Sequence, residues 1–287
     1  MSDPGKTEIR CEVCPRGCLL REGQTGACRA RSAGKTGTTS LNYGKITGLA
    51  LDPIEKKPLA CYRPGSRILS IGSFGCNLFC PFCQNYEISQ TGLSEEAERT
   101  RLFVREMTPE QLCALADELR GEGNIGLAYT YNEPLVGWEF VRDTARLVKE
   151  AGMDNVVVTN GCVKKEILRE VLPCIDAMNI DLKAFTEEGY VRLGGDLQTV
   201  QETIRLASRE CHVEVTSLIV PGLNDTEEDM EREAAWLAGI DPFIPLHITR
   251  FFPRYRMNTG EPTSVRLMEK LEKTAKKHLQ RVYLGNI

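Results

Sequence analysis

The sequence has no apolar run of about eighteen residues, the length that a transmembrane helix needs. Residues 1–6 lack the apolar core of a secretory signal peptide, so we expect a soluble, cytoplasmic protein with no membrane partner. The formal net charge is −4, and this slightly acidic balance does not provide the broad basic surface with which proteins clamp nucleic acid. Membrane proteins and electrostatic nucleic-acid binders are therefore excluded.

Cysteine is abundant, with 12 residues in a chain of 287. In a reducing compartment these thiols are expected in metal sites or in the core rather than in disulfides. Cys76, Cys80 and Cys83 share one short loop, in which Gly75 permits a close approach of the backbone. Three thiolates at this spacing can hold three irons of a cubane iron–sulfur cluster and leave the fourth iron open. A structural zinc knuckle is the alternative, but zinc generally takes a fourth ligand at the site.

Four further cysteines, Cys11, Cys14, Cys18 and Cys28, lie among glycines near the start of the chain. Their spacing predicts a tetrahedral metal site, either structural zinc or a second iron–sulfur cluster, with free loop thiols as the alternative. We assign them to a small N-terminal Cys-rich segment, residues 1–66. This segment carries eleven Lys and Arg against six Asp and Glu, which indicates an ordinary solvated surface or a docking face for an acidic partner.

Residues 67–287 alternate apolar, β-rich stretches with amphipathic stretches of helical period, the pattern of βα units in an α/β fold with a parallel sheet. The expected strands are 67–72, 125–131, 155–159, 177–182, 212–220 and 245–251. The expected helices are 108–122, 137–151, 164–172, 196–210, 226–238 and 263–279. Thr108–Gln111 and Asp225–Glu228 have the pattern of helix starts, with a capping side chain followed three residues later by Gln or Glu.

Polar residues accompany every expected strand near its carboxyl end. They are Cys76, Asn132, Glu133, Thr159, Asn160, Asp181, Lys183, Glu214, Thr216, His247, Thr249 and Arg250. Any one of them could be a core polar group with a hydrogen-bond partner. Polar residues near the ends of six strands indicate a ligand cavity, because buried polar groups cost free energy unless they have hydrogen-bond partners or a ligand.

The Cys76, Cys80 and Cys83 motif, with the aromatic Phe82 directly before its last cysteine, resembles the signature of the radical S-adenosylmethionine (SAM) superfamily. The resemblance implies a partial (β/α)6 barrel and a [4Fe-4S] cluster whose open iron binds SAM. It implies reductive cleavage of SAM to a 5′-deoxyadenosyl radical, which abstracts hydrogen from a substrate. It also implies an electron donor such as flavodoxin or ferredoxin and an anaerobic setting.

Within that superfamily the chain resembles the branch of pyruvate formate-lyase activating enzyme. Tyr131–Pro134 stands in the place of the branch's Gly-Gly-Glu-Pro element, in which the Glu holds the SAM amino group. Thr159–Gly161 and Asp181–Lys183 match two further SAM-pocket elements, whereas Thr216 replaces an Arg near SAM. The cofactor-binding residues implied or inferred are Phe82, Asn132, Glu133, Thr159, Asn160, Asp181, Lys183, Glu214 and Thr216.

Three further sequence segments, Leu51–Leu59, Cys83–Ser89 and His247–Phe251, resemble the radical SAM component of the AmmeMemoRadiSam system. That resemblance implies an AMMECR-type or Memo-type partner, so a protein residue or a small molecule could be the substrate. Activation of a glycyl-radical enzyme is an alternative activity. A non-catalytic iron–sulfur interaction or sensor protein is the alternative from another functional class.

His247 and Arg250 are the candidate catalytic residues on the sixth expected strand. His247 could face the cavity as a substrate contact or proton donor, with a hydrogen-bonded core histidine as the alternative. Arg250 could replace the cationic group that the branch carries at the position of Thr216.

Overall fold

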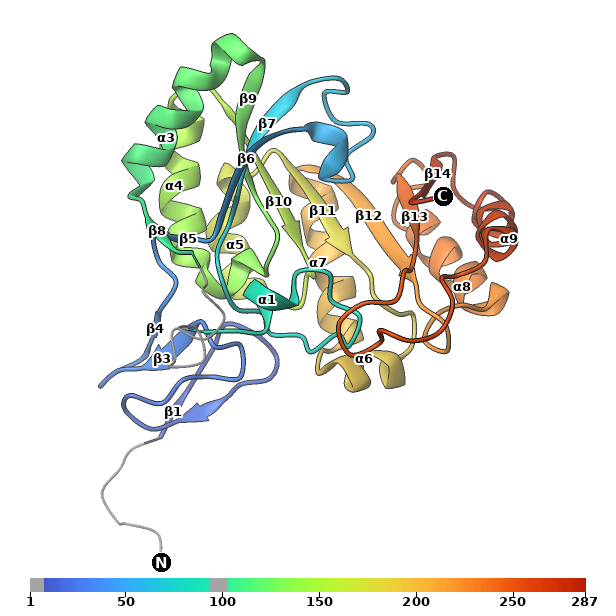
Figure 1. Cartoon of the computed structure of the whole chain (residues 1–287), viewed down its shortest axis with the longest axis horizontal. Helices are drawn as coiled ribbons and strands as arrows, with labels where there is room; N and C mark the ends of the chain where they lie inside the picture. Colours follow the sequence, from blue (N-terminus) through green and yellow to red (C-terminus); the bar gives the residue numbers. More distant parts are fainter. Residues whose placement is uncertain (1–7, 93–102) are drawn as a thin grey trace, which may run out of the picture.

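Parallel strands form the centre of the molecule in the computed structural model, which describes residues 8–92 and 103–287 (Figure 1). The expectation drawn from residues 1–6 lies outside these residues. One eight-stranded sheet contains all six expected strands. Along the sheet they are β14 (Val282–Gly285), β13 (Leu246–Arg250), β12 (His212–Ile219), β11 (Ala177–Asp181), β10 (Asp154–Thr159), β9 (Asn124–Tyr129), β7 (Arg67–Gly72) and β6 (Gly48–Pro53).

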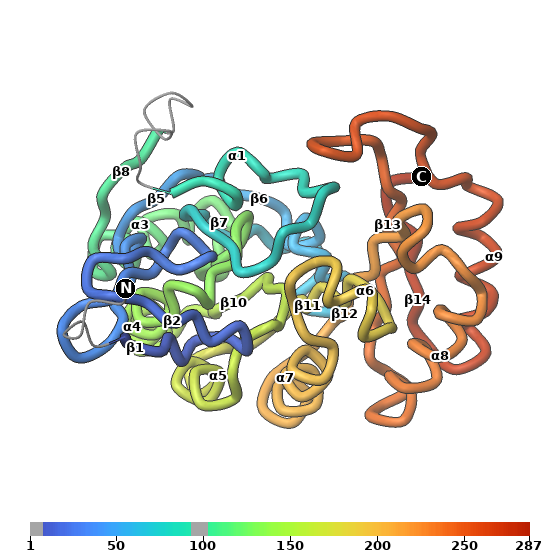
Figure 2. Tube along the Cα trace, turned by 90° about the horizontal axis from the view of Figure 1, so that it is seen from below, coloured from blue at the N-terminus to red at the C-terminus, as the bar shows by residue number. Residues whose placement is uncertain are grey.

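The neighbours from β7 to β14 are parallel, and only β6 runs antiparallel to its neighbour β7. The sheet curves without closing, and its helices follow one side (Figure 2). They are α3 (Pro109–Glu118), α4 (Trp138–Glu150), α5 (Lys165–Val171), α7 (Leu197–Glu210), α8 (Glu227–Ala238) and α9 (Val265–Ala275). The predicted α/β architecture of a partial barrel is therefore confirmed.

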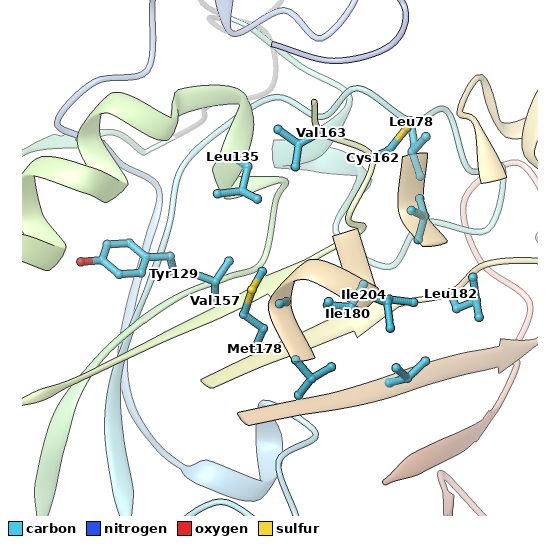
Figure 3. Packing of buried hydrophobic residues seen from close by; sticks show 14 of the residues in the cluster. Leu78, Tyr129, Leu135, Val157, Cys162, Val163, Met178, Ile180, Leu182 and Ile204 are labelled. Carbon is cyan, nitrogen blue, oxygen red and sulfur yellow. The ribbon is translucent and has the colours of Figure 1, made fainter. Parts of the chain in front are cut away.

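Apolar stripes on these helices pack against the sheet and build the main core (Figure 3). Met178 and Ile180 of β11 and Ile204 of α7 are fully buried there. On α9, Met268, Leu271 and Ala275 are also fully buried, whereas Val265, which begins the helix, is 38% exposed.

The observed helix starts follow from local capping. At α3, the Thr108 hydroxyl accepts from the backbone N–H of Gln111, and the Gln111 side chain accepts from the N–H of Thr108. This capping box was predicted. At α8 the N-cap is Thr226, which accepts from Asp229, so the cap lies one residue after the predicted Asp225.

β6 and the residues after it line the inward face of the sheet. Ile54, at the start of the short helix η1 (Ile54–Lys56), and Leu59 are fully buried. They share a cluster with apolar side chains of the central strands, namely Ile68, Ala128, Val156 and Ala177. The sheet thus takes an edge strand and part of its inner packing from residues before Arg67.

The first part of the N-terminal segment, residues 8–40, lies at the carboxyl ends of the strands (Figure 1). It contains the pairs β1 (Ile9–Arg10) with β2 (Leu19–Leu20) and β3 (Arg31–Ala33) with β4 (Thr38–Ser40), while β5 (Lys45–Ile46) pairs with β8 (Arg105–Glu106). Buried Arg31 fixes the segment to α4, because its guanidinium lies 2.8 and 2.9 Å from the two carboxylate oxygens of Glu139.

Three short helices, α1 (Tyr86–Ser89), η3 (Pro134–Gly137) and α6 (Glu187–Leu193), lie near the strand ends and were not predicted. Among the described residues, no helix combines the length and hydropathy that crossing a membrane requires.

Candidate functional site

A cavity of about 280 Å³ opens at the carboxyl ends of the strands. Most of the predicted site residues line it, and they come from the cysteine loop and from β9, β10, β11 and β12 or the residues just after these strands. They are Cys76, Cys80, Phe82, Cys83, Asn132, Glu133, Thr159, Asn160, Asp181, Lys183 and Thr216. The structure thus brings three thiols, two carboxylates and one ammonium group around one space, as expected at the strand ends of a barrel.

The cysteine loop follows β7 and turns sharply at Gly75. Gly75 has φ +88°, and a Cβ on it would lie 2.6 Å from the carbonyl oxygen of Cys28 and 2.7 Å from the Cβ of Ala30. No side chain fits at this position, so the turn requires glycine. The loop closes with a hydrogen bond from the N–H of Cys83 to the carbonyl of Cys80, 3.2 Å long.

Burial raises the pKa of the Cys80 thiol to about 12, although nearby Lys183 acts in the opposite direction. Burial also raises the pKa of Cys76 well above its usual value, and the Glu133 carboxylate adds to the shift. Both thiols are therefore protonated in the metal-free chain. A thiolate at these positions needs a cation beside it, which is the environment that a metal cluster supplies.

Glu133 lies at the end of β9 and is almost completely buried. Its Oε1 accepts from the Thr159 hydroxyl at 2.7 Å and from the N–H of Leu135 at 3.0 Å, and its Oε2 accepts from the N–H of Asn160 at 2.8 Å. Burial raises the pKa of Glu133 to about 7, although these three donors favour the charged form. A carboxylate has about four acceptor positions, so one remains for a cationic group in the cavity.

Tyr131 and Asn132 connect the end of β9 to the cysteine loop. Tyr131 has φ +71°, a left-handed conformation that glycine adopts more readily. The Asn132 side chain donates to the carbonyl of Gly75 at 3.1 Å and accepts from the N–H of Ser73 at 2.9 Å.

Asp181 and Lys183, at the end of β11, form an ion pair of 2.9 Å in the cavity wall. Burial opposes the charge on Lys183, but Asp181 outweighs this effect and raises the pKa of Lys183. Lys183 therefore remains a cation beside Cys80.

Asn160 supports the cysteine loop from the end of β10. Its side-chain nitrogen lies 2.9 Å from the Asn77 side-chain oxygen and 3.5 Å from the Cys76 sulfur. Its side-chain oxygen accepts from the N–H of Cys162 at 2.8 Å. Asn160 therefore orients a loop thiol as well as lining the cavity.

Three predicted site residues are not among those lining the cavity, and the structure corrects their placement. Glu214 points to deeper groups: its carboxylate accepts from the N–H groups of Ala60 and Cys61 at 3.0 and 2.8 Å, and the Nε2 atoms of His212 and His247 lie 2.9 and 2.6 Å away. His247 is thus a hydrogen-bonded core histidine, the alternative interpretation of this residue.

Arg250 was also predicted at the site. Its Nε donates to the carbonyl of Thr263 at 2.6 Å, and its guanidinium lies over the Phe252 ring. These contacts attach the loop after β13 and direct the side chain away from the cavity wall.

Several lining residues were not predicted as site residues. Tyr131, Gln84 and Asn85 line the cavity beside the cysteine loop, and Asn286 lines it directly after β14. Thr249 of β13, one of the polar residues expected at the strand ends, lines the cavity as well. No local pattern indicates Asn286, because its position follows from the pairing of β14 with β13.

The structure brings Cys11, Cys14, Cys18 and Cys28 near one another beside the cysteine loop; three are buried and Cys18 is partly exposed. All twelve cysteines have free thiols. Among the described residues, no three His, Cys, Asp or Glu side chains converge as the ligands of a single metal ion do.

Comparison with protein families matches residues 70–237 to the radical SAM superfamily. The chain belongs to the radical SAM superfamily. Membership implies a [4Fe-4S] cluster and SAM as cofactors, and the thiols and polar groups of the cavity have the chemistry to hold both.

Two relatives of this chain and one solved structure with a similar fold place it further. The uncharacterized protein MJ0808 of Methanocaldococcus jannaschii is 38% identical over 283 residues, which are 98% of this chain and 82% of the relative. Pyruvate formate-lyase 1-activating enzyme of Escherichia coli K12 is 26% identical over 173 residues, 59% of this chain and 67% of that protein. SuiB of Streptococcus suis, solved with S-adenosylmethionine bound, has a TM-score of 0.56 at 10% identity, covering 74% of this chain and 48% of SuiB, which shows the shared fold.

Proposed function

We propose that this radical SAM protein is an enzyme that holds a [4Fe-4S] cluster on Cys76, Cys80 and Cys83 and reductively cleaves SAM. The observation that carries the proposal is the shared cavity. Three thiols on one turn lie opposite buried, oriented polar groups that a purely structural cluster does not need. When bound and reduced, the cluster supplies the electron that breaks a carbon–sulfur bond of SAM, which yields methionine and a 5′-deoxyadenosyl radical.

Different residues of the cavity fit the amino group and the carboxylate group of the methionyl part of SAM. Glu133 keeps one acceptor position free and fits the amino group, which is the role implied by its place in the activating-enzyme element. Lys183 is a buried cation in the cavity wall and fits the carboxylate, while Asp181 keeps it charged. Asn132 and Asn160 hold the loop against the strand ends, so the thiols and Glu133 keep fixed relative positions.

The proposal also covers the substrate. We infer that the radical abstracts hydrogen from a partner protein or from a small molecule. The similarity to a pyruvate formate-lyase 1-activating enzyme favours activation of a glycyl-radical enzyme as the second candidate. Membership of the AmmeMemoRadiSam system, with an AMMECR-type or Memo-type partner, rests on the sequence phrases around Leu51–Leu59, Cys83–Ser89 and His247–Phe251. A flavodoxin or ferredoxin is the expected reductant, and the cytoplasm the expected location.

The test is anaerobic reconstitution with iron and sulfide, reduction with dithionite and chromatographic measurement of 5′-deoxyadenosine. We expect the product from the wild-type chain and none from Cys76→Ala, which also loses iron because one cluster ligand is missing. Cys113→Ala is the matched control, since Cys113 lies on α3 and does not line the cavity.

A fully loaded wild-type protein that yields no 5′-deoxyadenosine would contradict the enzymatic proposal. It would favour the non-catalytic iron–sulfur interaction or sensor protein.

A further inference from the structure

Cys11, Cys14, Cys18 and Cys28, called here the four-cysteine set, lie near one another. Cys11, Cys14 and Cys28 are buried, and Cys18 is partly exposed. A hydrogen bond of 2.9 Å from the N–H of Cys11 to the carbonyl of Cys18 closes one side of the set. Four cysteines gathered in this way form a site that a metal centre would stabilise.

The four-cysteine set directly touches the loop that carries Cys76, Cys80 and Cys83. The N–H of Cys76 donates to the carbonyl of Cys28 at 3.2 Å, so one ligand residue of each set meets through the main chain. The glycine at position 75 permits this contact, because its hypothetical Cβ would lie 2.6 Å from the same carbonyl. No side chain separates the two sets at this point.

One side chain bridges the two sets. The Asn77 side-chain oxygen lies 4.0 Å from the Cys76 sulfur, and the Asn77 side chain lies beside the thiol of Cys14. Asn77 is 4% exposed, so the bridge excludes water. A centre on the four-cysteine set would therefore lie next to the catalytic cluster with one side chain between them.

Main-chain contacts on two sides fix this arrangement. The N–H of Lys164, just before α5, donates to the carbonyl of Val13 at 3.0 Å. The Arg16 guanidinium donates to the carbonyl of Gly194 at 2.7 Å and stacks over Phe79 of the cysteine loop. The four-cysteine set is thus held as firmly to the barrel as the loop itself.

The thiol positions favour a polynuclear cluster over zinc. A zinc site places all four sulfurs about 2.3 Å from one ion, hence close to one another. Among the described residues, neither the four-cysteine set nor the set of Cys76, Cys80 and Cys83 converges on one point in this way. The chain belongs to the radical SAM superfamily, which implies an iron–sulfur cluster for the second set. A cubane does not require such convergence, because each thiolate binds a different iron.

The outer side of the four-cysteine set provides a point where an electron can enter. Cys18 is the only member that is not buried, and its neighbour Leu19 is 54% exposed. Exposed Arg16 and Arg21 flank these two residues. Leu19 offers an apolar contact, and Arg16 and Arg21 can pair with acidic groups of a reductant protein, although exposed Glu12 and Glu22 lie in the same stretch.

We propose that the four-cysteine set binds a second [4Fe-4S] cluster that relays single electrons from an acidic reductant protein to the cluster on Cys76, Cys80 and Cys83. This inference rests on the proposed function. The reductant, a reduced ferredoxin or flavodoxin, loses one electron to the four-cysteine set. The same electron then passes to the catalytic cluster, which consumes it in the cleavage of SAM, so no further oxidant or reductant is needed. Because electron transfer through protein falls steeply with distance, the direct contact of the two loops favours this route.

The test removes Cys11 and Cys18 together as Cys11→Ala/Cys18→Ala. This choice leaves intact Cys14 and Cys28, whose contacts reach the catalytic loop. We expect about eight irons per wild-type chain and about four in the double variant. In the double variant, SAM should still change the electron paramagnetic resonance signal of the remaining reduced cluster. Formation of 5′-deoxyadenosine should stay within about twofold of wild type with dithionite, and fall about tenfold or more with reduced ferredoxin.

The matched control is Cys113→Ala/Cys174→Ala, which removes two half-buried cysteines outside both sets. It should keep about eight irons and wild-type rates with either reductant. The reciprocal variant, Cys76→Ala/Cys80→Ala/Cys83→Ala, keeps the four-cysteine set. It should retain about four irons and a reduced-cluster signal that SAM does not change, which tests the second cluster even if the first variant fails to fold.

Two results would overturn the relay: wild-type protein with one zinc and only about four irons, or ferredoxin-driven rates in the double variant equal to wild type. If the wild-type chain cleaves SAM with dithionite but shows either result, only the relay fails. If it holds about eight irons and never cleaves SAM, the proposed enzymatic function fails while the second cluster stands.

Discussion

Three buried glutamates of this chain show how donors decide the charge of a buried carboxyl group. Burial raises the pKa of each, but the number of hydrogen-bond donors differs. Glu214 meets four donor groups, and its pKa falls to about 2. Glu133 meets three, and its pKa rises to about 7. Glu233 meets only the Ser217 hydroxyl, and its pKa rises to about 8. The carboxyl with the most donors is thus the most firmly ionised.

Glu233 gives a pH-dependent prediction. Its pKa in the folded chain, about 8, exceeds the ordinary value of 4.5, so the folded state binds the proton more tightly than the unfolded chain. The resulting stability is complete below pH 4.5 and is lost as the pH rises through 8. We expect Glu233→Gln, which cannot ionise, to gain on the order of 3 kcal/mol relative to wild type between pH 5 and pH 8.

The measurement is denaturant unfolding of both proteins across this pH range under anaerobic conditions. Glu228→Gln on the exposed face of the same helix should show no such trend. A constant difference between wild type and Glu233→Gln at all pH values would show that this carboxyl does not titrate on folding.

At the scale of elements, periodicity was sufficient for β7, for the strands from β9 to β13 and for the helices that cover them. It failed for β6, whose side chains are mostly half-exposed and show no clean alternation. The position of β6 depends on its pairing with β7, which no local pattern encodes. The same limit applies to α6, a short helix among the loops at the strand ends.

The site was predictable where motifs and strand ends coincide. Glu133, Asp181 and Lys183 lie at the ends of strands, so the carboxyl edge of the sheet brings them together. The prediction for Glu214 failed because strand alternation gives the face of the sheet on which a side chain lies but not its depth in the barrel. It lies two residues deeper than Thr216, at a level that Ala60 and Cys61 fill. Only the tertiary position of residues 54–66 determines where the cavity ends.

Glu214 connects elements that are distant in sequence, and this gives a prediction for stability. Its carboxylate joins the segment around Cys61 to β12 and β13 through His212 and His247. Glu214→Gln places an amide NH₂ donor among groups that themselves donate, which leaves buried donors without an acceptor. We expect a loss of about 3 kcal/mol in the free energy of unfolding.

Chemical denaturation of Glu214→Gln measures this loss, with Glu210→Gln at the exposed end of α7 as the control. The variant should still bind iron and show a SAM-responsive cluster signal, because Glu214 does not line the cavity. Unchanged stability together with lost SAM binding would reverse the assignment and return Glu214 to the cofactor site.

At the scale of the whole molecule, the chain divides its charge unevenly although its net charge is only −4. The N-terminal segment is basic, and its residues 8–40 cover the edge of the barrel where the catalytic loop lies. Acidic groups predominate elsewhere. The asymmetry matters for the relay, because long-range attraction would bring an acidic reductant to the same edge at which electrons are used.

Arg21 tests this arrangement. Its side chain is about half exposed, and its nearest acidic group is Glu8, at 3.8 Å. Arg21→Glu reverses one charge beside Cys18 without removing a metal ligand. We expect the rate of 5′-deoxyadenosine formation with reduced flavodoxin to fall several-fold at low ionic strength. The rate with dithionite should not change, since dithionite does not require a docking surface.

Salt distinguishes attraction from a change in structure. The Debye length falls from about 10 Å at 0.1 M to about 3 Å at 1 M ionic strength, so the difference between wild type and Arg21→Glu should shrink as salt is added. Arg209→Glu, on the exposed face of α7, changes the net charge equally but away from the four-cysteine set and should leave the rate near wild type. If Arg209→Glu slows flavodoxin-driven turnover as much as Arg21→Glu, total charge rather than the N-terminal surface governs the encounter, and electrons enter the molecule elsewhere.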